Sequence, residues 1–135
     1  MNNKLNKYLN QLNQLLLDLD NTYDINSGAC ALVASILAKF FENHNISYAT
    51  KVYYYDSDFE CAWHYALIID NIEINPSTYQ YEDFEYEISR VETSWNSESL
   101  LNKYKFIIDD SNYWKLKNEK IVMKKIEDFL NNIRF

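Results

Sequence analysis

Apolar residues recur along the chain with different spacings, and each spacing predicts an element of secondary structure. Within residues 3–20, leucines fall at steps of three and four, the pattern of a helix with one buried face. Residues 29–43 carry apolar side chains on nearly every side and predict a helix that is buried all round. Residues 21–28 form the predicted loop between them, with Ser27 in position to cap the second helix.

The middle of the chain favours strands. Residues 48–55 and 61–69 are rich in β-branched and aromatic side chains, which suit a pleated sheet. Asp70 and Asn71 form the signal of a tight hairpin, and a short third strand follows at residues 72–74.

A fourth strand is indicated by alternation. Phe84, Tyr86 and Ile88 are separated by Glu85 and Glu87, so one face of this strand is expected to be in water.

The remainder of the chain favours helices, over residues 98–104 and, with a clearer apolar face, over residues 119–133. The order of elements predicts an α+β fold, in which a buried helix packs on a small antiparallel sheet. We expect one domain over residues 1–135, with helical flanks at residues 1–20 and 98–135.

Composition and charge narrow the classes of partner. Hydrophobic residues make up 47% and charged residues 24%, which is ordinary for a globular domain. The net charge of -7 argues against nucleic acid and against docking on anionic membranes, and it permits a basic peptide. The oligomeric state stays open. Because residues 1–7 are polar and lack the apolar region of a signal peptide, we expect a cytoplasmic location with reduced thiols.

Cys30 is the first candidate for chemistry, because it falls in the first turn of the buried helix. The N-terminus of a helix carries unpaired N–H groups and a partial positive charge, and both favour a thiolate. The same N–H groups can hold the oxyanion of a tetrahedral intermediate. The alternative is a buried structural cysteine, since a thiol packs like a small apolar group.

His64 and Asn75 are the second and third candidates. His64 lies mid-strand on the face that also carries Ala66 and Ile68, and this face is expected to pack on the helices. A side-chain carbonyl of Asn75 could accept the imidazole N–H and fix the ring, as in a Cys-His-Asn triad. The alternatives are a core histidine satisfied by backbone groups, and an Asn-Pro turn ending at Pro76.

These residues form a combined motif. A glycine-x-cysteine ending at Cys30 opens the buried helix, which leads through residues 45–49 into a strand. His64 then stands on a strand that continues through the hairpin to residues 75–77. In this order and spacing, residues 27–78 resemble the core of the transglutaminase-like and papain-like cysteine enzymes.

The resemblance implies a helix carrying Cys30, packed on a sheet carrying His64 and Asn75, and acyl transfer through a thioester. The acidic third member of the transglutaminase-like site falls on Asn75, and papain-like enzymes use asparagine there. The compact leader peptidases of lasso-peptide biosynthesis are similar in size and layout. The family also includes proteases, deamidases and crosslinking transferases. We expect no cofactor and no metal.

One position departs from the family pattern. Papain-like enzymes use a glutamine shortly before the cysteine as a second oxyanion donor. Asp24 occupies that place, and a carboxylate cannot donate a hydrogen bond. The backbone N–H of Cys30 remains one candidate donor, with Asn26 or Tyr23 as the other.

The expected activity is hydrolysis at an amide by a thiol enzyme, acting on a peptide or protein as a cysteine protease or as a glutamine deamidase, with crosslinking left open. Acidic residues such as Glu82 and Asp83 could face a basic substrate or form a solvated strand face. The main alternative is an inactive relative that binds or inhibits another protein. A further alternative is a structural domain held by a Cys30–Cys61 disulfide.

Overall fold

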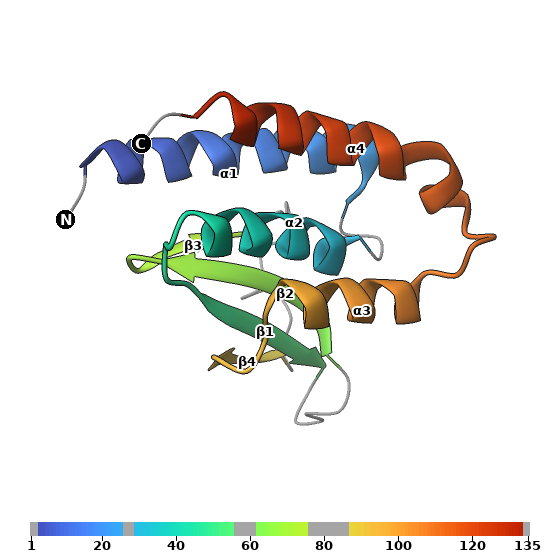
Figure 1. Ribbon diagram of the computed structural model, residues 1–135. Coiled ribbons are helices and arrows are strands. Elements are labelled where there is room, and N and C mark those ends of the chain that lie inside the picture. Colours follow the sequence, from blue (N-terminus) through green and yellow to red (C-terminus); the bar gives the residue numbers. More distant parts are fainter. Residues whose placement is uncertain (1–2, 26–28, 56–61, 76–86, 134–135) are drawn as a thin grey trace.

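The computed structural model describes residues 3–25, 29–55, 62–75 and 87–133. Within these ranges the protein has four helices and a four-stranded antiparallel sheet (Figure 1), which confirms the predicted α+β class. In chain order the elements are α1 (Asn3–Tyr23), α2 (Cys30–Asn43), β1 (Ala49–Tyr55), β2 (Ala62–Ile69), β3 (Ile72–Ile74), β4 (Glu87–Glu92), α3 (Ser97–Ile107) and α4 (Tyr113–Asn131).

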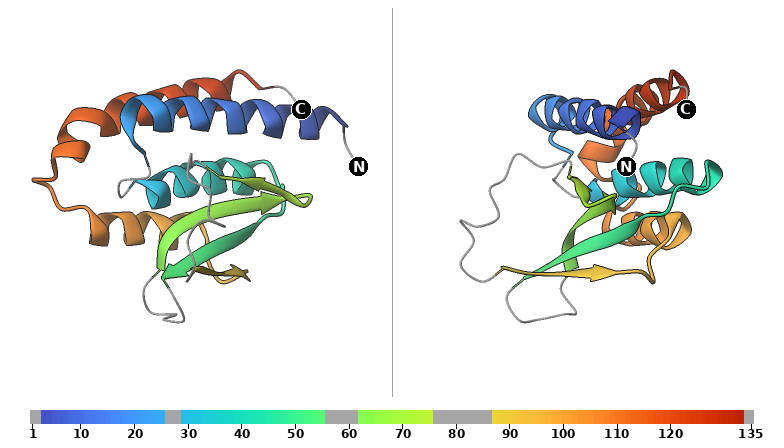
Figure 2. Two further views of the ribbon diagram at one scale, coloured as in Figure 1. Left: turned by 180° about the vertical axis from the view of Figure 1, so that it is seen from behind. Right: turned by 90° about the vertical axis from the view of Figure 1, so that its left-hand side faces the viewer.

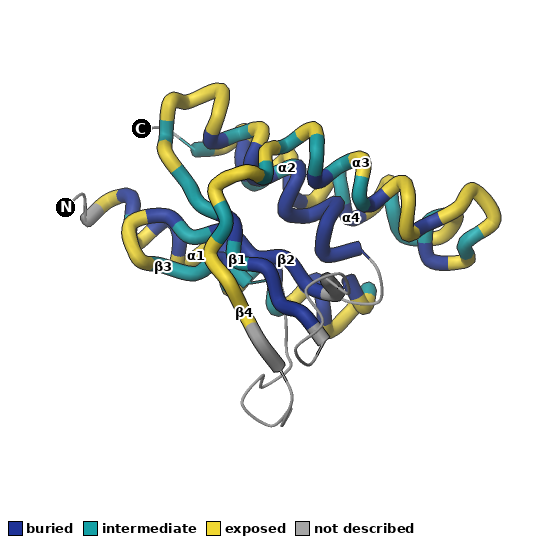
Figure 3. The backbone as a smooth tube through the Cα atoms, turned by 90° about the horizontal axis from the view of Figure 1, so that it is seen from below, coloured by how far each residue is buried: buried dark blue, intermediate teal, exposed yellow. Residues whose placement is uncertain are grey.

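Helix α2 is the central element of the fold. Helices α1 and α4 run side by side above it, and the sheet lies below (Figures 1 and 2). Because α2 contacts β2, α3 and α4, it is buried on most sides, as its nearly continuous apolar sequence predicts (Figure 3). The N-terminal end of α2, where Cys30 lies, is therefore held against the rest of the molecule.

The sheet has the order β3-β2-β1-β4, so β2 and β1 are its inner strands. Strands β2 and β3 are joined by the predicted hairpin at Asp70 and Asn71, both of which adopt positive φ. Strand β3 is short and pairs with β2 only from Ile69 back to Leu67. The part of β2 that precedes Leu67 in the chain therefore extends past the end of β3.

The face of β2 that packs on the helices differs from the expected one. The core contains Tyr65, Leu67 and Ile69, whereas His64 and Ala66 lie on the opposite face. The expectation that the His64 face packs on the helices is therefore wrong. Both faces of this strand are largely apolar, and the face with the larger side chains fills the core.

Three helices extend beyond their predicted bounds: α1 continues to Tyr23, α3 spans Ser97–Ile107, and α4 begins already at Tyr113. The earlier start of α4 has a local cause, because the Asn112 side chain accepts hydrogen bonds from the first backbone N–H groups of the helix. The buried Trp114 ring anchors this turn by donating from Nε1 to the carbonyl of Tyr23, at 2.6 Å. Of the predicted fourth strand, Phe84 and Tyr86 lie outside the described residues.

Candidate active site

Cys30 is the first residue of α2. Ala29 occupies the N-cap position and makes no side-chain capping bond, and the predicted cap Ser27 lies outside the described residues. The side chain of Cys30 is a thiol and not half of a disulfide, which argues against the alternative of a structural Cys30–Cys61 bridge. Cys61 itself lies outside the described residues.

The Cys30 sulfur reaches strand β2. A backbone hydrogen bond from Tyr65 acts on it, together with the backbone groups of Ala31 and of Cys30 itself. Tyr65 lies on the part of β2 that extends past the end of β3. The sulfur is therefore beside the residue that follows His64 in the chain.

His64 is buried, with 1% of its surface exposed. Its ring atom Nε2 lies 2.8 Å from Oδ1 of Asn75. The ring of Tyr53 lies against the imidazole, with 5.3 Å between ring centroids and a tilt of 53°. His64 and Asn75 are therefore in contact, in the arrangement expected of a histidine held by an asparagine.

Asn75 follows β3 and is held from two further sides. Its Nδ2 donates to the carboxylate of Glu73 at 2.8 Å. Its backbone N–H donates to the side chain of Asn13 on α1 at 3.0 Å, and Nδ2 of Asn13 donates to the carbonyl of Glu73 at 2.9 Å. One asparagine of α1 thus continues the hydrogen bonding along the free edge of β3 and fixes the segment that carries Asn75.

Glu73 has further partners on the same face of the sheet. Lys51 Nζ lies 2.9 Å from Oε1, and the hydroxyl of Tyr53 donates to both carboxylate oxygens at 2.9 Å. Burial raises the pKa of Glu73, but the hydrogen bonds from Asn75, Lys51 and Tyr53 outweigh it and hold the pKa below its usual value. Glu73 was not among the predicted site residues. Its position two residues before Asn75 could have indicated it, because alternate residues of a strand share a face.

The protonation states of Cys30 and His64 follow from their burial. Burial raises the pKa of the Cys30 thiol to about 11, although its backbone hydrogen bonds act in the opposite direction. Burial lowers the pKa of His64 to about 4, although Asn75 and Glu73 act to raise it. The pair is therefore a neutral thiol and a neutral imidazole near neutral pH. Burial thus opposes the expected thiolate, because loss of solvent raises the pKa of the thiol more than the backbone N–H groups at the helix N-terminus lower it.

The low pKa of His64 predicts a loss of stability in acid. The unfolded chain binds a proton near pH 6.5 and the folded chain only near pH 4, so stability is lost as pH falls between these values. The loss attributable to His64 amounts to about 3 kcal/mol.

The measurement is urea unfolding across this pH range for the wild type and for His64→Gln, which does not titrate. The two proteins share all their carboxylates, so the difference between their curves reports His64 alone. Parallel curves for the two proteins would contradict the prediction.

The oxyanion candidates are only partly brought to the site. The backbone N–H of Cys30 acts on its own sulfur at the N-terminus of α2. Tyr23 is half-buried, and its carbonyl faces Trp114 of α4. Asp24 is exposed and adopts positive φ. Asn26 lies outside the described residues. The helix N-terminus is therefore the donor group that the structure places beside the sulfur.

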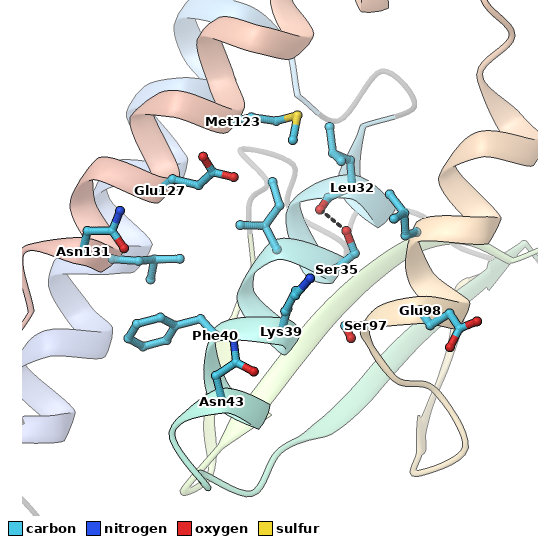
Figure 4. Close-up of a pocket in the computed structure, with 13 residues that line it drawn as sticks. Leu32, Ser35, Lys39, Phe40, Asn43, Ser97, Glu98, Met123, Glu127 and Asn131 are labelled. Carbon is cyan, nitrogen blue, oxygen red and sulfur yellow. Dashed lines mark hydrogen bonds between the residues drawn. The ribbon is translucent and has the colours of Figure 1, made fainter.

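The sulfur and the imidazole are closed off from solvent, since Cys30 is 2% and His64 1% exposed. A substrate can reach the sulfur only if the residues that cover it rearrange. A hollow of about 710 Å³ lies elsewhere, between α2, α3 and α4 (Figure 4). Its labelled lining residues include Ser35, Lys39, Phe40, Glu98, Met123 and Glu127.

Two further properties concern only the described parts of the chain. Their side chains contain no group of three or more His, Cys, Asp or Glu residues that could hold a metal ion. None of their helices combines the length and apolar character that crossing a membrane requires.

Comparison of the chain with protein-family models, with curated proteins and with solved structures gives no match in any of the three.

Proposed function

We propose that this chain is a cysteine-dependent enzyme that transfers an acyl group from an amide, built on a papain-like or transglutaminase-like core. The observation that carries the proposal is the 2.8 Å contact between Nε2 of His64 and Oδ1 of Asn75. The backbone of Tyr65, the next residue along β2, forms a hydrogen bond to the sulfur of Cys30. A thiol at a helix N-terminus, a histidine on an adjoining strand and an amide behind it have the parts of a Cys-His-Asn triad.

In the proposed reaction, the Cys30 sulfur attacks the carbonyl carbon of the amide while His64 takes the thiol proton. Because the His64 side chain leaves β2 on the face opposite the core, this transfer requires the imidazole to meet the sulfur at the edge of β2 that extends past the end of β3. His64 then gives this proton to the leaving nitrogen, and a thioester to Cys30 remains. Water attacks the thioester, with His64 again as base, and releases the acid and the thiol. Because both groups start neutral, the proton moves during the attack and no preformed ion pair is needed.

Hydrolysis of a peptide or protein amide is the favoured outcome, with deamidation of a glutamine side chain second. The backbone N–H groups at the start of α2 are the proposed donors to the oxyanion. They are fixed by the helix, so they need no reorganisation as negative charge develops on the carbonyl oxygen.

A second function is supported by a specific observation, the closure of the site. A thiol and an imidazole that solvent does not reach also suit an inactive relative that binds another protein. The hollow between α2, α3 and α4 offers such a protein a mixed lining of apolar side chains, such as Phe40 and Met123, and polar ones, such as Lys39 and Glu127 (Figure 4). Labelling of Cys30 separates the two functions.

The experiment is labelling with a peptide-based thiol electrophile at mildly acidic pH, followed by peptide mapping. An enzyme is expected to be labelled selectively at Cys30, because the peptide part of the electrophile binds beside the sulfur and His64 takes the thiol proton during the attack, whereas an ordinary thiol has no base beside it. The labelling is expected to disappear in His64→Ala. Equal, slow labelling of Cys30 and Cys61 would instead support the binding module. Mass spectra of candidate peptides after incubation then distinguish cleavage from deamidation and crosslinking.

A further inference from the structure

We propose that Glu73 is a positioning residue of this site: its carboxylate sets the direction of the Asn75 amide and, through Asn75, the tautomer of His64. The effect on the His64 ring follows from the hydrogen bonds alone. The effect on catalysis rests on the proposed function.

The first step is the orientation of Asn75. A carboxylate is only an acceptor, so the Asn75 atom that lies 2.8 Å from Glu73 Oε2 must be the donor Nδ2. The other amide atom, Oδ1, then faces His64. A turn of the amide by 180° would bring two oxygens together at Glu73, so the carboxylate excludes that orientation.

The second step is the tautomer of His64. Because Oδ1 of Asn75 accepts, Nε2 of His64 must carry the proton. The neutral ring then has its lone pair on Nδ1, so Nδ1 is the ring atom that can accept a proton. Were the amide reversed, Nε2 would hold the lone pair instead and Nδ1 would be protonated, so Nδ1 could not act as the base of the proposed function.

The third step is what holds Glu73 itself. Lys51 and Tyr53 come from β1, and Glu73 comes from β3, so these residues meet across the central strand β2. Ala66 pairs with Lys51 in β2 and has a small side chain. The carboxylate is therefore fixed by a cation, a hydroxyl and an amide, although 30% of the Glu73 side chain remains exposed.

Replacing Glu73 with glutamine tests this chain of contacts with almost no change in shape. Three donors face the two carboxylate oxygens, whereas a glutamine amide has one oxygen and one NH₂ group. The lysine attracts the single oxygen, which turns the NH₂ group toward Asn75. We expect Asn75 to reverse and the His64 tautomer with hydrogen on Nδ1 to gain population.

The readout is the pair of ¹⁵N chemical shifts of the His64 ring in the full chain, which reports the tautomer without any substrate. The wild type is expected to be mainly in the form with hydrogen on Nε2. Glu73→Gln is expected to shift the ring toward the other form. With a substrate, kcat is expected to fall about 10- to 100-fold, by analogy with residues that orient metal-binding histidines, with little change in KM.

Glu92→Gln is the matched control. Glu92 also accepts from a tyrosine of β1, Tyr54, and pairs with a cation, Arg90. It lies on β4, on the face of the sheet opposite to Glu73 and His64, and also accepts from Trp95. Removing its charge is expected to leave the His64 ring shifts unchanged. A shift equal to that in Glu73→Gln would show a general loss of sheet packing and overturn the proposal.

The double variant Glu73→Gln/Asn75→Asp reverses the donor and the acceptor between the two positions. Its glutamine NH₂ can donate to the new carboxylate, which in turn accepts from Nε2 of His64. The form with hydrogen on Nε2 is expected to return. Failure of this rescue in a folded double variant would mean that Glu73 acts only as a structural residue.

The outcomes separate this inference from the proposed function. If Glu73→Gln shifts the tautomer but the wild type has no activity, Glu73 is confirmed as a positioning residue of the His64 ring. The proposed function, and with it the expected fall in kcat, is then wrong. Activity with unchanged ring shifts and unchanged kcat in Glu73→Gln overturns the inference and leaves the function standing. If Glu73→Gln does not fold, the wild-type spectrum decides, because a ring protonated mainly on Nδ1 overturns the proposed hydrogen bonding.

Discussion

Replacing Cys30 with alanine is expected to abolish turnover of an amide substrate while the protein remains folded. The sulfur is the atom that bonds to the acyl group in the proposed mechanism, and alanine has no atom to take its place. The change removes a single buried atom at the first residue of α2, so the unfolding transition should stay cooperative. Turnover of a peptide substrate and thermal unfolding are measured on the same sample.

His64→Ala and Asn75→Ala complete the series with graded effects. Loss of the base is expected to cost about 10²- to 10⁴-fold in turnover, the range for a general acid–base group. Loss of Asn75 is expected to be milder, because the imidazole remains but is no longer held. Cys61→Ala serves as the control and should keep full activity.

Two outcomes of this series would contradict the proposal. If Cys30→Ala keeps the full biological effect of the protein, the enzyme hypothesis is wrong. If Cys30→Ala or His64→Ala unfolds the chain, the residue is part of the core and its loss of activity carries no information on chemistry.

Leu37→Ala is expected to have the opposite effect, a large loss of stability with the chemistry untouched. Leu37 lies on α2 and is 1% exposed in the centre of the core. Truncation removes buried apolar surface and leaves a cavity, which together cost about 2–5 kcal/mol. The free energy of unfolding in urea and the activity per folded molecule are the two measurements.

Lys39→Ala is the matched control on the same helix. Lys39 is exposed, so its truncation should change the free energy of unfolding by no more than about 0.5 kcal/mol. An equal loss in the two variants would contradict the prediction, because alanine favours the helix at both positions and only Leu37 buries its side chain in the core. A loss of activity in folded Leu37→Ala would show that the core and the site are coupled.

The local pattern of the chain predicted most of the elements but not all of their bounds. The buried helix at residues 29–43 and the hairpin at Asp70 and Asn71 were predictable, since periodicity and turn chemistry act over a few residues. The start of α4 was not, because it depends on the Asn112 cap and on Trp114 reaching a carbonyl of α1.

The faces of β2 could not be assigned from alternation alone. Alternation separates His64 and Ala66 from Tyr65 and Leu67, but each set is apolar enough to be buried. Only the packing of α2 against the sheet selects the face with Tyr65 and Leu67 for the core. The opposite face is then available for the polar contacts of His64.

For the site, the sequence by itself determined the chemical types and their order: a thiol at the start of a buried helix, a strand histidine, and an asparagine after a hairpin. The tertiary structure decided that His64 meets Asn75, that Glu73 contacts the Asn75 amide, and that burial raises the pKa of the thiol and lowers that of the imidazole. The reason is physical. Spacing along a strand or helix is a local property of the chain, whereas a pKa and a hydrogen bond depend on which distant segments exclude water and supply partners.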